Sequence, residues 1–210
     1  GLILRTRPYT ETSLLVHWIT AEAGRLTTLA KGARRPKSLF CGRLDLFYEA
    51  KLSFCRSRRS DLHLLREAVL RDTHPRLRKD FQALRQAAYC ALLVEQVTET
   101  DTPIPAVYLL LTQLVNVLDR QGAMPVAVVA FEWKLLAELG LAPTLVAPAS
   151  GAGVDHILHY LASVDLGSVR TLSLTPAQMT EVGQIIGGLF AEHCGRVPRG
   201  RAVALGTNAG

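Results

Sequence analysis

The sequence has few residues of the kinds that define disulfide-rich, zinc-binding or membrane-spanning proteins. Its 210 residues include only four cysteines, which lie far apart and form no C-x-x-C pair. This spacing argues against a disulfide framework and a cysteine zinc site, and it is typical of a reducing compartment. No signal peptide is visible, and no apolar run reaches the roughly 18 residues needed to cross a bilayer. We therefore expect a cytoplasmic protein with no membrane partner and no cofactor.

Acidic residues are absent between Glu22 and Asp45. The same stretch is rich in cations around a loop that contains Gly32 and Pro36, and these cations are Arg25, Lys31, Arg34, Arg35, Lys37 and Arg43. Cations packed this closely repel one another unless an anion lies among them. A polyanion is the natural partner, and nucleic acid is the commonest one. The alternative is a solvated basic loop that serves only solubility.

The charge is unevenly divided along the chain. Residues 1–85 contain 18 Lys and Arg against 8 Asp and Glu, a net charge of +10, whereas residues 86–210 have a net charge of −4. This asymmetry favours a surface for nucleic acid or for a membrane on the first part only.

The hydrophobic pattern predicts strands in the first part of the chain. Residues 44–55 alternate between apolar and polar positions and form the clearest strand pattern. Four other short segments read as strands, and turn residues separate them, which is typical of a small barrel. The expected strands are residues 1–7, 13–20, 25–30, 44–55 and 62–69.

Helical spacing replaces this alternation after His74 and Pro75. We expect helices over residues 77–95, 106–120, 126–139, 155–164 and 176–193, followed by a ragged tail after Val197. Asp72 or Thr73 would cap the first helix, and Thr175 with Gln178 would cap the last. The fold class is therefore α+β: a five-stranded OB-fold barrel over residues 1–73 and a helical domain over residues 74–210.

A small barrel with basic loops is a common scaffold for single-stranded nucleic acid, in which cations contact phosphates and aromatic rings stack on bases. Trp18 and Tyr48 lie in apolar runs, so a core position is the stronger interpretation for both, and Phe40 is a further candidate ring. Tyr9, in a turn beside Pro8, is the better stacking candidate. The candidate DNA-binding cations are Arg5, Arg7, Arg25, Lys31, Arg34, Arg35, Lys37, Arg56, Arg58 and Arg59.

We find no catalytic constellation, so we do not expect an enzyme. Ser13 and Ser38 have no identifiable histidine and acid partners. The pair His156 and His159 could join the His193-Cys194 dipeptide in a zinc site, but packed or surface histidines are the favoured interpretation, and we expect no metal. The glycines at 183, 187 and 188 predict close packing of the last helix.

Three motifs in the first part of the chain resemble the RecO family of bacterial recombination mediators. They are RPYTETSLL at 7–15, GRLTTLAKGARRPKS at 24–38 and LLREAVL at 64–70, and the later FEWKLLAELGLAP at 131–143 is similar to the central helix of that family. The basic loop of the family corresponds to Lys31, Arg34, Arg35 and Lys37. Many members carry a four-cysteine zinc element that corresponds here to about residues 144–153, where this sequence has no cysteine.

This resemblance implies an OB-fold followed by a helical domain, and a DNA-repair role in the bacterial cytoplasm near the nucleoid. The implied activities are binding of single- and double-stranded DNA, annealing of complementary strands and, with RecR, loading of RecA onto DNA coated by the single-stranded-DNA-binding protein SSB. The acidic tail of SSB would suit a groove in the helical half, with Arg120 or Lys134 at its rim. Two other functions stay open: an OB-fold RNA-binding protein, and a non-enzymatic adaptor that docks an acidic protein.

Overall fold

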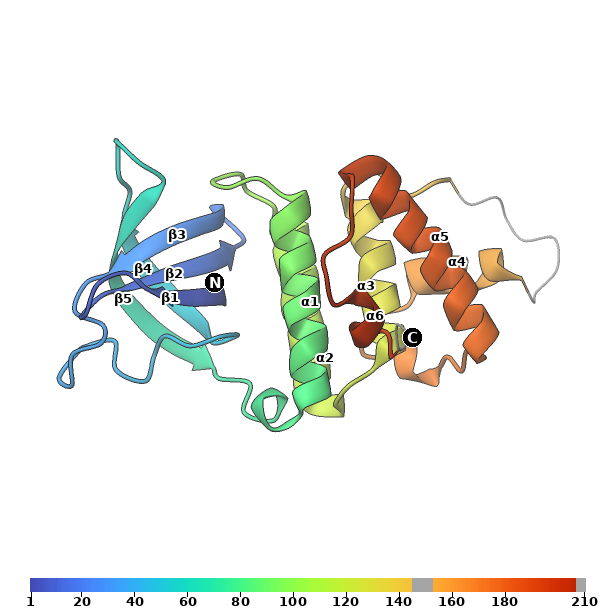
Figure 1. Ribbon diagram of the computed structural model, residues 1–210, viewed down its shortest axis with the longest axis horizontal. Coiled ribbons are helices and arrows are strands. Elements are labelled where there is room, and N and C mark those ends of the chain that lie inside the picture. The colour runs from blue at the N-terminus through green and yellow to red at the C-terminus, as the bar shows by residue number, and fades with distance from the viewer. Residues whose placement is uncertain (145–152, 207–210) are drawn as a thin grey trace. The chain divides into compact units, whose positions relative to one another are not determined.

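Five strands form a closed barrel in the computed structural model, which describes residues 1–144 and 153–206 (Figure 1). Neighbouring strands follow the order β1-β2-β3-β5-β4, and every pair is antiparallel except β3 with β5. This arrangement confirms the predicted OB-fold barrel. The strands are β1 (Leu2–Pro8), β2 (Leu14–Thr20), β3 (Gly24–Ala30), β4 (Glu49–Cys55) and β5 (Leu62–Asp72).

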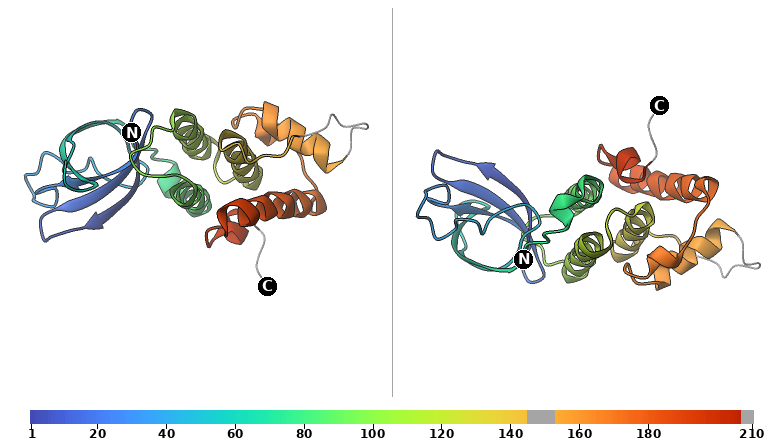
Figure 2. Two further views of the ribbon diagram at one scale, coloured as in Figure 1. Left: turned by 90° about the horizontal axis from the view of Figure 1, so that it is seen from above. Right: turned by 90° about the horizontal axis from the view of Figure 1, so that it is seen from below.

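The barrel core follows from the period-2 pattern of its strands. Along β3, Leu26 and Ala30 are buried while Arg25 and Thr27 are partly exposed. Trp18 of β2 is fully buried, and its indole N–H donates a hydrogen bond to the Thr28 hydroxyl at 2.9 Å. The views from above and below show how the strands curve around this core (Figure 2). Trp18 is therefore a core residue, as its apolar surroundings in the sequence favoured.

The fourth strand is shorter than its alternating pattern predicts. It begins at Glu49, because residues 44–48 form a turn in which Phe47 has a φ of 59°. Phe47 is buried, and its carbonyl oxygen accepts a hydrogen bond of 2.7 Å from Nδ1 of His74. The prediction of a strand over 44–55 is wrong for the first five residues, because apolar alternation also suits a turn that buries one side chain.

The described chain divides into two compact units. The first, called here the barrel unit, comprises Gly1–Pro75 and Thr98–Leu109, and the second, the helical unit, comprises Arg76–Val97 and Leu110–Gly210. In the barrel unit, the Asp101 backbone N–H donates to the Arg25 carbonyl at 2.7 Å. Gly24 permits this close approach, since a Cβ there would lie 1.8 Å from the Thr102 oxygen. The expected domain boundary at residue 74 stays a prediction.

Helix α3 (Pro125–Glu138) forms the centre of the helical unit and packs against α1, α4, α5 and the short helix η2 (Val169–Thr171). Its side chains are buried almost all round, including Phe131 and Trp133, which is typical of a central helix. The other helices are η1 (Leu77–Lys79), α1 (Phe81–Val97), α2 (Pro105–Gln121), α4 (Val154–Ser163), α5 (Pro176–Cys194) and α6 (Arg201–Ala204).

Side-chain caps begin two of these helices. Thr175 accepts from the Gln178 backbone N–H at 3.2 Å while the Gln178 side chain accepts from the Thr175 backbone, so the predicted capping box of α5 is confirmed. At α1, the Asp80 carboxylate accepts from the N–H groups of residues 82 and 83 at 3.0 Å each. The prediction that Asp72 or Thr73 caps this helix is wrong, because the helix begins later and Asp80 occupies the capping position.

Within the described residues, the segment after Val197 contains helix α6, so it differs from the ragged tail that its sequence predicts. Arg201 of α6 donates two hydrogen bonds of 2.7 Å to the carboxylate of Glu132, which is fully buried in α3. The Tyr89 hydroxyl donates to the same carboxylate. A Cβ at Gly187 would lie 2.9 Å from the Arg201 guanidinium. The predicted close packing at Gly187 therefore serves a buried ion pair.

No helix within the described residues combines the length and the apolar character that crossing a membrane requires.

Candidate nucleic-acid interface

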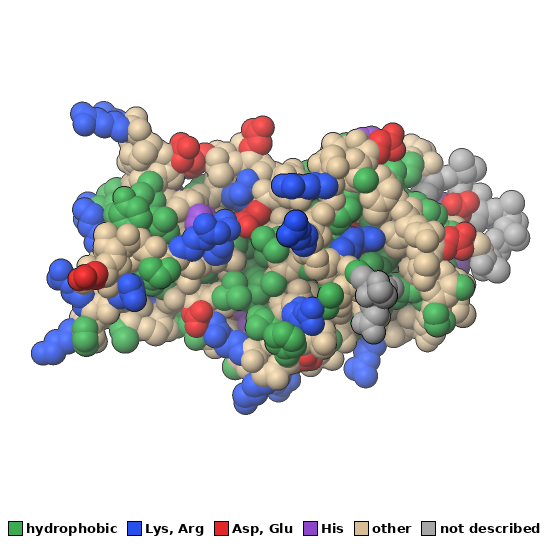
Figure 3. All heavy atoms as spheres, viewed as in Figure 1, with side chains coloured by type: hydrophobic (Ala, Val, Ile, Leu, Met, Phe, Trp, Pro, Cys, Tyr) green, Lys and Arg blue, Asp and Glu red, His purple; other side chains and the backbone are tan. Residues whose placement is uncertain are grey.

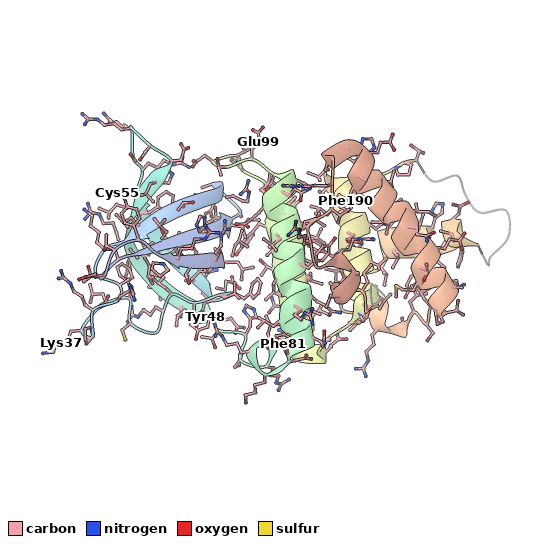
Figure 4. All side chains as sticks on the ribbon, viewed as in Figure 1. Lys37, Tyr48, Cys55, Phe81, Glu99 and Phe190 are labelled. Atoms are coloured by element: carbon pink, nitrogen blue, oxygen red, sulfur yellow. The ribbon has the colours of Figure 1, made fainter. Side chains whose placement is uncertain are left out.

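The basic loop, residues 31–38, follows β3 directly and carries four exposed cations. Gly32 has a φ of 69° and turns the chain, and the Arg35 N–H then donates to its carbonyl at 3.0 Å. Ala33 is buried in the barrel core and anchors the loop. In Figure 4, Lys37 points away from the barrel into solvent. The loop thus holds its cations on the surface while one small apolar residue holds the loop in place.

Arg34 attaches the basic loop to the turn between β1 and β2. Its backbone N–H donates to the Thr12 carbonyl at 2.9 Å, and its guanidinium donates to the Thr10 carbonyl at 3.2 Å. These two hydrogen bonds join the basic loop to the β1–β2 turn, so both segments contribute to one surface. Arg34 is therefore a positioning residue as well as a surface cation.

Two hollows flank the basic loop, and Lys31, Gly32 and Arg35 line both of them. The first, of about 380 Å³, extends to the β1–β2 turn, and the second, of about 360 Å³, extends to Lys37 and residues 38–40. Among the described residues, no acidic side chain lines either hollow. Figure 3 shows Lys and Arg side chains interleaved with apolar ones on the barrel part of the face that it displays. This combination of cations and apolar surface suits a nucleic-acid strand.

Two further cations, Arg5 and Arg7, lie on β1, beside β2. Arg5 is paired with His17 in the strand register, and Arg7 is paired with Leu15. Burial, the largest cause, and the neighbouring charges of Arg5, Arg7 and Arg25 together lower the pKa of His17 to about 4. The imidazole is therefore neutral at pH 7, and this part of the barrel carries a positive potential.

Arg25 and Arg56 are held by the loop between α1 and α2. The Arg25 guanidinium donates to the Thr98 hydroxyl at 2.8 Å and to its carbonyl oxygen. Arg56 forms an ion pair of 3.1 Å with Asp101 and lies 5.9 Å from the Phe54 ring centroid. Sequence reasoning placed both with the DNA-binding cations, and it missed Asp101, which lies 45 positions from Arg56 and has no local signal in the sequence.

The remaining β4–β5 cations, Arg58 and Arg59, are exposed. This connection stacks the Phe54 ring on His63, with centroids 5.5 Å apart. His63 is buried, and its Nε2 atom lies 3.2 Å from the Asp101 carboxylate. Asp101 therefore neutralises one end of the β4–β5 connection, whereas Arg58 and Arg59 stay available to solvent.

The aromatic candidates separate clearly by burial. Trp18 is in the core, and Phe40 and Tyr48 are partly buried against the same core. Tyr9 is 55% exposed and lines the first hollow together with Lys31 and Arg35.

In the helical unit, Arg120 lines a groove of about 340 Å³ between the end of α2 and residues 165–167. Asp165 and Gln121 line the same groove. Lys134 does not line it, and its ammonium donates to the Ala162 carbonyl at 2.8 Å, near the end of α4. Burial lowers the pKa of Lys134, and the charges of Asp165 and Glu138 oppose that effect.

Within residues 1–144 and 153–206, no three His, Cys, Asp or Glu side chains are arranged to hold a metal ion. The segment that corresponds to the zinc element of the family lies almost entirely outside the described residues.

Comparison with known proteins agrees with this architecture. A family model described as "Recombination protein O N terminal" matches residues 1–74, and one described as "Recombination protein O C terminal" matches residues 78–155. DNA repair protein RecO of Haemophilus influenzae is 33% identical over 173 residues, which cover 82% of this chain and 72% of that protein. The RecO of Xanthomonas oryzae pv. oryzae is 30% identical over 85% of this chain and 73% of its own length.

This chain belongs to the RecO family. The RecO of Myxococcus xanthus is 32% identical over 143 residues, and that match covers 68% of this chain but only 58% of the relative. The chain thus spans little more than half the length of some RecO proteins that it matches. The first three family motifs in the sequence fall on β1 with the β1–β2 turn, on β3 with the basic loop, and on β5. Of these segments, the β1–β2 turn and the basic loop line the first hollow.

Proposed function

We propose that this protein is a DNA-repair mediator that binds DNA through the basic loop and anneals complementary strands. The observation that carries the proposal is the pair of hollows lined by Lys31, Arg35 and Lys37 without an acidic side chain among their lining residues. Because no described acidic side chain lines these hollows, an external polyanion would supply the opposite charge. Membership of a family whose relatives are named DNA repair proteins makes DNA the favoured polyanion.

Annealing of this kind requires no catalytic group, so the proposed activity is non-enzymatic. Phosphate contacts position a strand without reading its sequence. A surface that reduces phosphate repulsion between two strands, while leaving base edges free, would accelerate pairing. We expect binding to single and double strands that is independent of sequence and weakens steeply with salt.

In the wider reaction, we propose that the protein acts with RecR to load RecA onto DNA coated by SSB, in the bacterial cytoplasm. The groove beside Arg120 would hold the acidic, apolar tail of SSB, with the guanidinium facing a carboxylate. Arg120→Glu should abolish binding of a synthetic SSB-tail peptide in calorimetry, whereas Arg170→Glu, an exposed control in the same unit, should not. Equal affinities of the two variants would contradict this assignment.

The decisive test is fluorescence anisotropy of a labelled single-stranded oligonucleotide as a function of salt. The variant Lys31→Ala/Arg35→Ala/Lys37→Ala should lower the log–log salt slope by roughly 2, at about 0.7 per lost phosphate contact. The variant Arg170→Ala/Arg196→Ala/Arg199→Ala removes three exposed cations from the helical unit and is the matched control. An equal fall in both variants would show that only net charge matters.

The same assay separates the two other functions. Tighter binding of RNA than of DNA, with no annealing of complementary DNA strands, would favour an RNA-binding protein. No binding of nucleic acid by the wild type would favour an adaptor that docks an acidic protein.

A further inference from the structure

Tyr9 differs from the other aromatic residues near the basic loop because the residue is 55% exposed. It lies just after β1, in the turn that leads to β2. Exposed rings without contacts are not unusual on their own. This ring, however, lines the same hollow as Lys31 and Arg35.

The backbone that carries Tyr9 is held firmly. The N–H groups of Tyr9 and Thr10 both donate to the Ser13 carbonyl, at 3.0 and 3.4 Å. The Ser13 N–H donates back to the Thr10 hydroxyl at 3.1 Å, and Ser13 is buried. A ligand that contacts the ring therefore does not have to order this turn first, which reduces the entropic cost of binding.

The hydrogen bonds of Arg34 also fix where the turn that carries Tyr9 lies relative to the cations of the basic loop. The Arg34 guanidinium donates to the Thr10 carbonyl and the Arg34 backbone N–H donates to the Thr12 carbonyl, so the turn is tied to the basic loop at two points. The hollow between them has a volume of about 380 Å³, near the lower end of the range of about 300–1,000 Å³ that is typical of small-molecule sites. One flat heterocycle with its sugar is an occupant of suitable size and chemistry.

We propose that Tyr9 stacks on one unpaired base of a bound strand while Lys31 and Arg35 contact the phosphates beside that base. This subsite deepens the proposed function and rests on it. A base in a duplex is already stacked on its neighbours and cannot reach the ring, so the subsite favours single-stranded over double-stranded DNA. A single ring stacks on one base and leaves the other bases of the strand free to pair, which is compatible with annealing.

The first test compares Tyr9→Ala and Tyr9→Phe with the wild type in anisotropy assays on a short mixed-sequence oligonucleotide and its duplex. Tyr9→Ala should raise the single-strand Kd about 5- to 150-fold, the equivalent of about 1–3 kcal/mol. Its duplex Kd should change less than about twofold, because phosphate contacts are intact. Tyr9→Phe keeps the ring and should bind like the wild type. Phe81→Ala, which removes another exposed ring outside the basic loop, should change neither value.

The second test identifies directly which aromatic residue stacks on the base. Irradiation of a complex with an oligonucleotide that contains 5-iodo-deoxyuridine crosslinks the base to a stacked aromatic side chain, and mass spectrometry of the digest identifies that residue. We expect the crosslink at Tyr9. A crosslink at Phe40 or Tyr48 alone, or equal losses of single-strand and duplex affinity in Tyr9→Ala, would overturn the proposal.

The two proposals can fail separately. If Lys31→Ala/Arg35→Ala/Lys37→Ala loses DNA binding but Tyr9→Ala does not, the stacking subsite is wrong and the basic loop stands. If the cation variant binds DNA like the wild type, the proposed function of the loop is itself wrong.

Discussion

The barrel unit and the helical unit use arginine in opposite ways. In the helical unit, Arg201 is paired with the buried Glu132 through two short hydrogen bonds. In the barrel unit, Arg35 is exposed and lines two hollows that no described acidic side chain borders. Arg56 is an intermediate case, since it is exposed but paired with Asp101. The difference shows that the role of a cation depends on whether the fold itself supplies an anion.

The largest loss of stability is expected for Arg201, because its anion is the buried carboxylate of Glu132 in the same protein. Arg201→Ala would leave the carboxylate of Glu132 buried without its cation, and breaking such a pair costs about 3–5 kcal/mol. The free energy of unfolding in urea should fall by that amount. Arg199→Ala, which removes an exposed cation two residues earlier, is the control. Equal stabilities of the two variants would mean that the buried pair contributes nothing and that the comparison fails.

A smaller loss of stability is expected at the point that joins the basic loop to the β1–β2 turn. Arg34→Ala and Arg35→Ala remove one charge each, but only Arg34 donates to the Thr10 carbonyl. Arg34→Ala should therefore lower the free energy of unfolding by about 0.5–1.5 kcal/mol, the typical net contribution of a hydrogen bond. Thermal unfolding of the two variants side by side measures the difference, and a larger loss in Arg35→Ala would refute the positioning role.

Arg56 offers a way to convert a paired cation into an available one. Asp101→Asn removes the acid and keeps a side chain that tolerates the φ of 55° at this position. The log–log salt slope for single-stranded DNA should then steepen by about 0.7, because one more cation can contact phosphate. Glu99→Gln removes a nearby charge that is not paired with Arg56 and should leave the slope unchanged. A steeper slope in both variants would point to net charge alone.

The smallest effect concerns pH. The pKa of His17 is about 4 in the folded protein, below the value of about 6.5 in an unfolded chain. The unfolded state therefore takes up a proton first, and stability should fall as pH drops from about 6.5 towards 4. Urea unfolding at several pH values should show a shallower decline in His17→Gln. An identical pH dependence in the two proteins would remove His17 from the explanation.

Much of the barrel could be predicted from local patterns. The alternation along β3 places one set of side chains inside the barrel and leaves the other set partly exposed, and turn residues separate the strands. The same reasoning failed at residues 44–48, where the buried side chain of Phe47 belongs to a turn with a positive φ. Hydrophobic periodicity indicates which side chains are buried. It does not indicate whether the backbone continues as a strand or turns.

The candidate site was only partly predictable. The basic loop and Tyr9 were visible because their residues are neighbours in the sequence or lie beside turn residues. The pairing of Arg25 with Thr98 and of Arg56 with Asp101 was not visible, since each contact joins positions far apart in the chain. Cations that look equivalent in the sequence therefore differ in how available they are to DNA.

The sequence by itself determined the OB-fold barrel, the helical second half, the family and the position of the basic loop, because periodicity, turn residues and charge clusters are local properties. Only the tertiary structure decided which cations stay available, that Arg34 holds the β1–β2 turn, and that Arg201 closes a buried pair with Glu132. The physical reason is that the availability of a charge depends on the groups that folding brings next to it, and those groups come from distant positions in the chain.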